Sequence, residues 1–150
     1  MMKLRGFEVV KQYKNSNINL PKRMTHHAAG YDIEAATDVE FAPGEIILVP
    51  TGLKAYMQND EVLYLYSRSS LPMKKGLILT NSVGVIDADY YNNPNNDGHL
   101  LIQMKNTGDQ PAAIKKGERI AQAVFAKYLL AGDDDGQPKQ QRRGGFGSTQ

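Results

Sequence analysis

A short apolar run that ends in two carboxylates and a tyrosine lies near the middle of the chain, at residues 80–90 (Thr-Asn-Ser-Val-Gly-Val-Ile-Asp-Ala-Asp-Tyr). A strand that carries Asp87 at its end gives this carboxylate a fixed position and a partly dry environment. A general base needs both, because it must reach the proton that it removes and must have a suitable pKa. Asp also commonly opens turns, so this stretch alone is equally typical of an ordinary strand end. Other motifs in the chain decide between these interpretations.

The end of the chain has the composition of a phosphate-binding segment. Arg142 and Arg143 are followed by Gly-Gly-Phe-Gly-Ser-Thr. Glycine lets backbone N–H groups approach an anion closely, Ser148 and Thr149 add hydroxyl donors, and arginine adds a bidentate guanidinium. Phe146 has no apolar neighbours in the sequence, which suits stacking on a flat partner such as a nucleobase. Taken alone, the same composition is also typical of a disordered end.

Three other positions can contact phosphates or a metal ion. The run Ser67-Arg68-Ser69-Ser70-Leu71 follows a predicted strand and opens a short predicted helix. Hydroxyl and N–H groups at a helix start bind anions, although serine there is also an ordinary helix cap. Asp32 can hold hydrated Mg²⁺, which keeps several waters and uses few carboxylates, or can be a turn residue after Gly30. Gln122 lies in an otherwise apolar strand, where its amide is either structural or a ligand contact.

Together these groups fit one class of reaction. They comprise one candidate base, one candidate metal carboxylate, several phosphate-binding segments and one aromatic residue that can cover a ligand. No nucleophile–base pair of the Ser-His-Asp or Cys-His kind emerges. The set suits the hydrolysis of a nucleoside polyphosphate by an activated water, with Mg²⁺ bound to the phosphates.

The composition excludes several other classes of protein. A length of 150 residues is typical of one domain, and the absence of cysteine excludes disulfides and thiolate chemistry. A net charge of +2, from 18 basic and 16 acidic side chains, is too balanced for direct nucleic-acid binding. We find neither a signal peptide at the start nor an apolar run long enough to cross a membrane, and we expect a cytoplasmic protein.

Short strands separated by turn signals must position these groups. We expect one short helix at 69–75, and strands at 7–11, 32–36, 39–41, 45–50, 53–56, 62–66, 100–104 and 120–125. Segments 41–46 and 114–120 each join an apolar residue to a strand through a Gly-Glu turn, and we interpret them as two similar hairpins. Frequent turns without a long helical period predict an all-β barrel or jelly roll.

The composition changes after residue 131. Residues 1–131 form the predicted β domain, whereas 132–150 are polar and glycine-rich. This arm lacks the apolar surface to fold alone, so we expect it to be mobile until something orders it.

Five motifs, in this order and near this spacing, resemble those of the homotrimeric dUTP pyrophosphatases (dUTPases). They span the chain from 28 to 149 and are Ala28–Ile33, Ser67–Leu71, Gly84–Tyr90, Arg119–Gln122 and Gly144–Thr149. The resemblance implies a distorted jelly-roll or β-clip-like barrel and a homotrimer in which three subunits build each site. It also implies Mg²⁺-assisted hydrolysis of dUTP to dUMP and pyrophosphate, which limits uracil in DNA and supplies dUMP.

The resemblance further implies a role for each matching position. Asp87 would activate the water that attacks the α-phosphorus, and Asp32 would hold Mg²⁺ through water. Tyr90 would lie against the deoxyribose and leave no room for a 2′-hydroxyl, while the arm closes and Phe146 stacks on uracil. Contacts to the nucleotide would come from Arg68, Ser69, Ser70, Asn81, Gly84, Val85, Ile86, Leu101, Gln122, either Arg142 or Arg143, Gly147, Ser148 and Thr149.

The chain departs from the family pattern mainly after Tyr90. Residues 91–97 (Tyr-Asn-Asn-Pro-Asn-Asn-Asp) lengthen the hairpin that should hold uracil, and Ser70 stands where many members have glycine. A dCTP deaminase-like enzyme is one alternative, but that group needs a glutamate where this chain has Asp87 and Asp89. A nucleotide-responsive regulatory protein is another, with loop 91–97 as a surface for a protein partner. A solvated insertion is the simpler interpretation of this loop.

Overall fold

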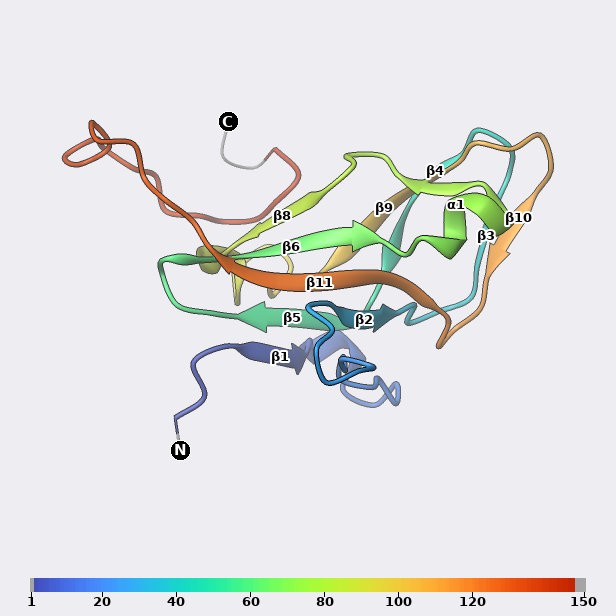
Figure 1. Cartoon of the computed structure of the whole chain (residues 1–150), viewed down its shortest axis with the longest axis horizontal. Helices are drawn as coiled ribbons and strands as arrows, with labels where there is room; N and C mark the ends of the chain where they lie inside the picture. Colours follow the sequence, from blue (N-terminus) through green and yellow to red (C-terminus); the bar gives the residue numbers. More distant parts are fainter. Residues whose placement is uncertain (1, 148–150) are drawn as a thin grey trace.

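The computed structural model describes residues 2–147, and these residues fold almost entirely into short strands (Figure 1). One α-helix, α1 (Ser70–Lys75), and two 3₁₀ segments, η1 (Lys11–Tyr13) and η2 (Ala88–Tyr90), interrupt them. The strands are β1 (Gly6–Val9), β2 (Tyr31–Glu34), β3 (Val39–Phe41), β4 (Ile46–Pro50), β5 (Leu53–Tyr56), β6 (Glu61–Ser67), β7 (Leu77–Leu79), β8 (Gly84–Asp87), β9 (Leu101–Asn106), β10 (Ala112–Ile114) and β11 (Arg119–Lys127).

These strands form four antiparallel sheets, ordered β1-β5, β3-β10, β2-β11-β6-β8 and β4-β9-β7. Fully buried side chains from several sheets meet in one core, among them Ile33, Phe41, Leu63 and Met104. Burial alternates along β9, as expected for a strand with one face toward a core. The prediction of an all-β fold is confirmed, and the predicted helix is present, beginning at Ser70.

The two predicted hairpins are wrong, although the turns within them are alike. Gly44 and Gly117 both have positive φ angles, 78° and 85°, which favour glycine. In each turn the following glutamate, Glu45 or Glu118, accepts a hydrogen bond from a backbone N–H three residues earlier. However, β3 pairs with β10, β4 with β9, and β11 with β2 and β6. Each turn therefore sends the chain from one sheet to another, which a local sequence pattern does not reveal.

The predicted hairpin after Tyr90 is also wrong, and this has consequences for the site. β8 pairs with β6, whereas β9 pairs with β4 on one side and β7 on the other. Residues 88–100 are therefore a connection between two sheets rather than the tip of a hairpin. Strand β7, absent from the sequence prediction, occupies part of the β9 edge that a hairpin would have used.

The described part of the C-terminal arm leaves the end of β11 and returns alongside β8 (Figure 1). Among the contacts that hold it there, Arg142 forms ion pairs with Asp87 at the end of β8 and with Asp89 in η2, and Gly145 packs on the ring of Tyr90. Among the residues that the structure describes, no helix is both long and apolar enough to cross a membrane.

Candidate active site

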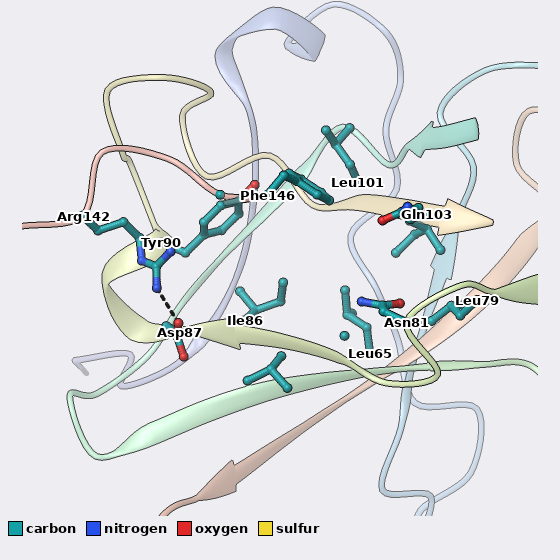
Figure 2. Close-up of a pocket in the computed structure, with 14 residues that line it drawn as sticks. Leu65, Leu79, Asn81, Ile86, Asp87, Tyr90, Leu101, Gln103, Arg142 and Phe146 are labelled. Atoms are coloured by element: carbon teal, nitrogen blue, oxygen red, sulfur yellow. Dashed lines mark hydrogen bonds and ion pairs between the residues drawn. The ribbon is translucent and has the colours of Figure 1, made fainter. Parts of the chain in front are cut away.

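A cavity of about 260 Å³ lies between β8 and β9, where the two sheets separate (Figure 2). Its size is close to the lower end of the range for small-molecule sites, about 300–1,000 Å³. The wall is mostly apolar, and a few polar side chains converge on it. The lining residues are Leu65, Leu79, Asn81, Gly84, Val85, Ile86, Asp87, Tyr90, Leu101, Ile102, Gln103, Arg142, Gly145 and Phe146.

Backbone groups on two strand edges are available to a ligand in this cavity. β8 is the last strand of its sheet, with β6 on one edge only. β7 ends at Leu79, opposite Met104, so Leu101 and Ile102 lie beyond the end of β7. At Gly84 the strands approach so closely that a Cβ would lie 3.0 Å from the Cβ of Leu65. Such unpaired edges can present N–H donors and C=O acceptors to a flat heterocycle.

Asp87 stands at the end of β8, at one side of the cavity, and is held by the arm. Arg142 Nη2 lies 2.5 Å from Asp87 Oδ2, and Arg142 Nε lies 2.6 Å from Asp89 Oδ1. The side chain of Asp87 is 51% exposed, and that of Arg142 is 18% exposed. The expectation of a partly dry environment for Asp87 is therefore wrong for this single chain, because the end of an edge strand is open to solvent.

Two aromatic rings line the cavity, Tyr90 at the end of η2 and Phe146 on the C-terminal arm. Tyr90 is buried, and its hydroxyl donates a hydrogen bond of 2.7 Å to the His99 carbonyl oxygen while it accepts one of 2.8 Å from Asn96 Nδ2. Burial raises the pKa of Tyr90, so its hydroxyl stays neutral and continues to donate. Phe146 lines the same cavity but is 60% exposed, as expected for a side chain at the mouth (Figure 2).

A second polar cluster gathers around Asp32. Gln122 on β11 lies directly opposite Asp32 on β2. Arg68 Nε lies 3.8 Å from Asp32 Oδ1, and Arg119 Nη1 lies 3.3 Å from Asp32 Oδ2. A Cβ on Gly30 would collide with the Gln122 side-chain oxygen, so glycine makes room for this amide. The cluster combines two guanidinium groups, an amide and one carboxylate, which suits binding of an anion together with a cation.

Ser69 and Ser70 adjoin this second cluster, because they follow Arg68 and begin α1. Neither residue is buried, and Ser69 makes no side-chain capping bond to the helix. The alternative interpretation of Ser69 as an ordinary helix cap is therefore not supported. Its hydroxyl is free to meet a ligand.

The two clusters lie at opposite ends of β6. Asp87 is paired with Val62 near the start of this strand, whereas Arg68 follows its last residue. Over the stretch from Val62 to Arg68 an extended backbone covers roughly 20 Å, at about 3.3 Å per residue. One copy of the chain thus does not bring its candidate base and its candidate phosphate ligands together.

The structure sorts the predicted site residues into groups. The predicted residues that line the cavity are Asn81, Gly84, Val85, Ile86, Asp87, Tyr90, Leu101, Arg142 and Phe146. Those in or beside the second cluster are Asp32, Arg68, Ser69, Ser70 and Gln122. Arg143 and Gly147 are exposed and belong to neither group, and Ser148 and Thr149 lie outside the described residues.

Sequence reasoning missed several residues of the two clusters. Asp89 pairs with Arg142, Arg119 pairs with Asp32, and Gln103 lines the cavity. Asp89 and Arg119 belong to motifs already singled out, and Gln103 is the polar residue in the apolar run 100–104. The contact of Asn96 with Tyr90 had no such signal, because loop contacts of this kind depend on the tertiary fold.

Comparison with known proteins identifies relatives along nearly the whole chain. A sequence model of the dUTPase family matches residues 16–150. The deoxyuridine 5′-triphosphate nucleotidohydrolase of Lactococcus lactis subsp. lactis (strain IL1403) is 66% identical over 148 residues, which are 99% of each chain.

Solved structures agree with this relationship. The crystal structure of a dUTPase from Streptococcus mutans superimposes with a TM-score of 0.81 at 60% identity, covering 84% of this chain and 98% of that one. A D95N variant of the dUTPase from phage phi11 of S. aureus, described as revealing the coordination of a structural Mg(II) ion, has a TM-score of 0.71 at 22% identity. It covers 92% of this chain and 96% of its own, and at that identity it supports the fold alone.

Proposed function

The chain belongs to the dUTPase family, and from this premise we propose that it hydrolyses dUTP to dUMP and pyrophosphate. The observation that carries the proposal is the cavity between β8 and β9, which has Asp87 at its side and Tyr90 and Phe146 in its wall. An apolar slot with unpaired strand edges suits a nucleobase, and a carboxylate at its side suits activation of water.

Recognition of uracil rests on the strand edges. Asn81, the backbone of 84–86 and the start of β9 at Leu101 surround the inner part of the cavity. Backbone donors and acceptors in fixed positions match the edge of uracil and mismatch that of cytosine, which would leave buried polar groups unpaired. Contact with the cavity wall would exclude the methyl group of thymine. Tyr90, held by its hydroxyl, lies where the deoxyribose follows the base and excludes a 2′-hydroxyl.

Asp87 is the proposed general base. It takes a proton from a water molecule, the water oxygen attacks the α-phosphorus, and the bond to the bridging oxygen breaks so that pyrophosphate leaves. In the structure Arg142 forms an ion pair with this carboxylate. Arg142 must therefore release Asp87 and turn to the phosphates before the base can act. Closure of the arm, residues 132–150, over the β domain of residues 1–131 would exclude water and position the phosphates.

The phosphate ligands of each site come from a second copy of the chain. Along β6, Arg68 lies roughly 20 Å from the position of Asp87 in the same chain, and Gln122, which pairs with Tyr66, lies roughly 13 Å from it, at about 3.3 Å per residue. Ser69 and Ser70 follow Arg68 and lie beyond the end of β6. A site that needs both clusters must therefore combine subunits, which accords with a homotrimer that shares its active sites.

Asp32 fits the carboxylate that a substrate-bound magnesium ion requires. Its side chain is 17% exposed and pairs with Arg68 and Arg119, and the described residues contain no group of three or more potential metal ligands. Mg²⁺ uses one or two carboxylates, keeps waters and takes its other ligands from substrate phosphates. When bound, the ion would neutralise charge on the triphosphate, and Asp32 would hold it through water.

A product assay across nucleotides tests this proposal. The purified protein is given each of the four canonical deoxynucleotides, dUTP and UTP with Mg²⁺, and pyrophosphate and monophosphate are measured. We expect dUMP and pyrophosphate from dUTP, and little turnover of the others. Ammonia release from dCTP would instead support the deaminase alternative and would overturn the proposal.

A further inference from the structure

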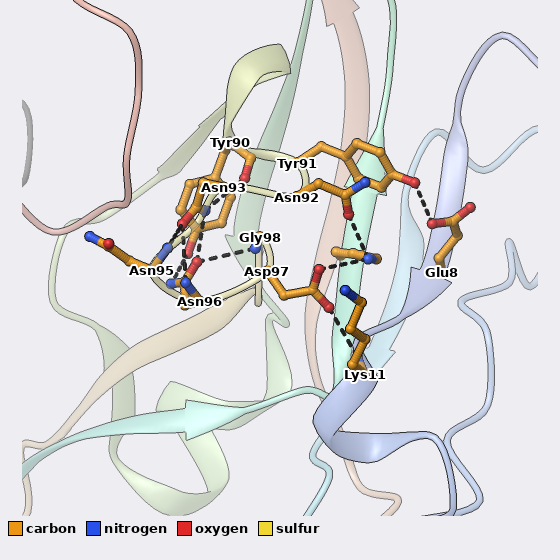
Figure 3. A network of polar contacts seen from close by, with 11 residues as sticks. Glu8, Lys11, Tyr90, Tyr91, Asn92, Asn93, Asn95, Asn96, Asp97 and Gly98 are labelled. Carbon is orange, nitrogen blue, oxygen red and sulfur yellow. Dashed lines mark hydrogen bonds and ion pairs between the residues drawn. The ribbon is translucent and has the colours of Figure 1, made fainter.

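Loop 91–97 is anchored firmly to other parts of the domain (Figure 3). The buried ammonium group of Lys54, whose side chain is 8% exposed, donates to Asn92 Oδ1 at 2.6 Å and to Asp97 Oδ1 at 2.9 Å. The other oxygen of Asp97 accepts a hydrogen bond of 3.0 Å from the backbone N–H of Lys11. Both ends of the loop therefore have fixed positions, unlike those of a solvated insertion.

Asn93 organises the middle of the loop from within. Its side chain is buried, and Nδ2 donates to the Tyr90 carbonyl oxygen at 2.8 Å and to Asn96 Oδ1 at 2.7 Å. Asn93 Oδ1 accepts from the backbone N–H groups of Asn95 and Asn96, both at 3.1 Å. These bonds fix the directions in which Asn95 and Asn96 project.

Asn96 connects the loop to the wall of the cavity. Its Oδ1 accepts from the Gly98 N–H at 3.1 Å, and its Nδ2 donates to the Tyr90 hydroxyl at 2.8 Å (Figure 3). The same hydroxyl donates to the His99 carbonyl oxygen. Because the Tyr90 hydroxyl donates one hydrogen bond and accepts another, the position of its ring in the cavity wall is fixed.

Asn95 connects the loop to the arm. Its backbone N–H donates to the Arg143 carbonyl oxygen at 3.1 Å. A Cβ on Gly144 would lie 2.5 Å from Asn95 Nδ2, and a Cβ on Gly145 would lie 2.8 Å from a ring carbon of Tyr90. Gly144 has no left-handed φ, so space rather than backbone conformation requires glycine there.

We propose that loop 91–97 is the docking surface of the C-terminal arm, and that Asn95 and Asn96 are positioning residues. Asn95 sets the path of Gly144, and this path brings Phe146 to the cavity mouth and holds Arg142 beside the site, where it can turn from Asp87 to the phosphates. Asn96 sets the position of Tyr90. The part of this inference that concerns turnover rests on the proposed dUTP hydrolysis, whereas the docking contact does not.

A steric mismatch and its repair test the docking contact. The sequence contains no tryptophan, so Phe146→Trp gives a single emission signal on the arm. In this background Gly144→Ala forces a methyl group against the Asn95 side chain, and Asn95→Gly removes that side chain while the backbone N–H remains. Gly132→Ala is the matched control, because nothing lies within 4 Å of a Cβ there.

We expect Gly144→Ala to shift the tryptophan emission toward that of an exposed residue and to lower kcat/KM for dUTP about tenfold, which corresponds to about 1.4 kcal/mol. Adding Asn95→Gly should return the emission to that of the Phe146→Trp protein. It should also restore kcat/KM for dUTP to within about twofold, because the overpacking is relieved. Equal behaviour of Gly144→Ala and Gly132→Ala, or no repair by Asn95→Gly, would overturn the docking contact. If the protein with its native Phe146 does not hydrolyse dUTP, the proposed function fails, while the emission of the Phe146→Trp series still decides the docking.

An isosteric change tests the role of Asn96. Asn96→Asp keeps the oxygen that accepts from Gly98 but removes the donor to the Tyr90 hydroxyl. Asn92→Asp is the control, since it adds the same charge to the loop and keeps the oxygen that accepts from Lys54. We expect Asn96→Asp to lower the ratio of kcat/KM for dUTP to that for UTP about tenfold, as for the loss of one hydrogen bond to a positioned group. An unchanged ratio would show that Asn96 does not position Tyr90, even if the melting temperature falls.

Discussion

Complementation between two inactive variants examines the shared active site directly. Asp87→Asn removes the proposed base, and Arg68→Ala removes a proposed phosphate ligand. The two residues lie at opposite ends of β6, roughly 20 Å apart along the strand at about 3.3 Å per residue. If each site takes Asp87 from one subunit and Arg68 from another, a mixed trimer contains sites in which both residues are intact.

The expected activity follows from the mixing statistics. In an equimolar random mixture, the subunit that supplies Asp87 and the subunit that supplies Arg68 are each intact with a chance of one half. About a quarter of all sites should then be complete in the unsorted mixture. A mixed trimer holds two copies of one variant and one of the other, so one of its three sites is complete, and purified mixed trimers should recover roughly a third of the native activity. Each parent alone should lose about 10²-fold or more, as expected for the loss of a general base or of a charged phosphate ligand.

The assay needs both variants in one assembly. Two different affinity tags and co-expression allow mixed trimers to be purified on both tags in turn, and pyrophosphate release from dUTP is then measured. Two differently tagged copies of Asp87→Asn, purified in the same way, provide the control. Doubly purified assemblies with no more activity than either parent would refute the idea that the two clusters of one site belong to different subunits.

Three more predictions each concern one variant of the protein. Asp87→Asn alone should bind a non-hydrolysable dUTP analogue with near-native affinity while kcat falls by about 10²–10⁴, the usual contribution of a general base; near-native kcat would remove Asp87 from this role. Truncation after Gln140 should leave the oligomer intact in sedimentation but lower kcat/KM for dUTP by at least about tenfold, as for loss of a closing lid; unchanged kinetics would mean that the arm has no part in turnover. The third prediction concerns acid stability. His99 accepts a hydrogen bond at Nε2 from the Gly52 N–H, and burial lowers its pKa from the usual 6.5, so the unfolded chain binds this proton first as the pH falls. Stability from this group should be complete above about pH 6.5 and decline below it, by up to about 1.4 kcal/mol per pH unit. In denaturant titrations from pH 7.5 to 5, the free energy of unfolding should decline less for His99→Gln than for the unsubstituted protein. Equal declines in the two proteins would exclude His99 as the cause.

The sequence by itself determined the class of fold and the composition of the site. Alternating and apolar runs report which residues can face a core, so most strands and the short helix at α1 were predicted near their observed places. The five motifs identified the residues of both clusters, because side-chain chemistry is a property of the residue and not of its neighbours. Glycines at 30 and 84 were part of these motifs, and each proves to leave space for a neighbouring strand or side chain.

Only the tertiary structure decided how these residues are grouped. The period of a strand says which face is buried but not which strand will pair with it, so the assignment of β8 and β9 to different sheets had no local signal. That assignment creates the cavity, and the pairing of β6 with β8 separates Asp87 from Arg68. Likewise, loop 91–97 has the composition of a solvated insertion, and its contacts with Lys54, Tyr90 and the arm depend on segments distant in sequence that folding brings together.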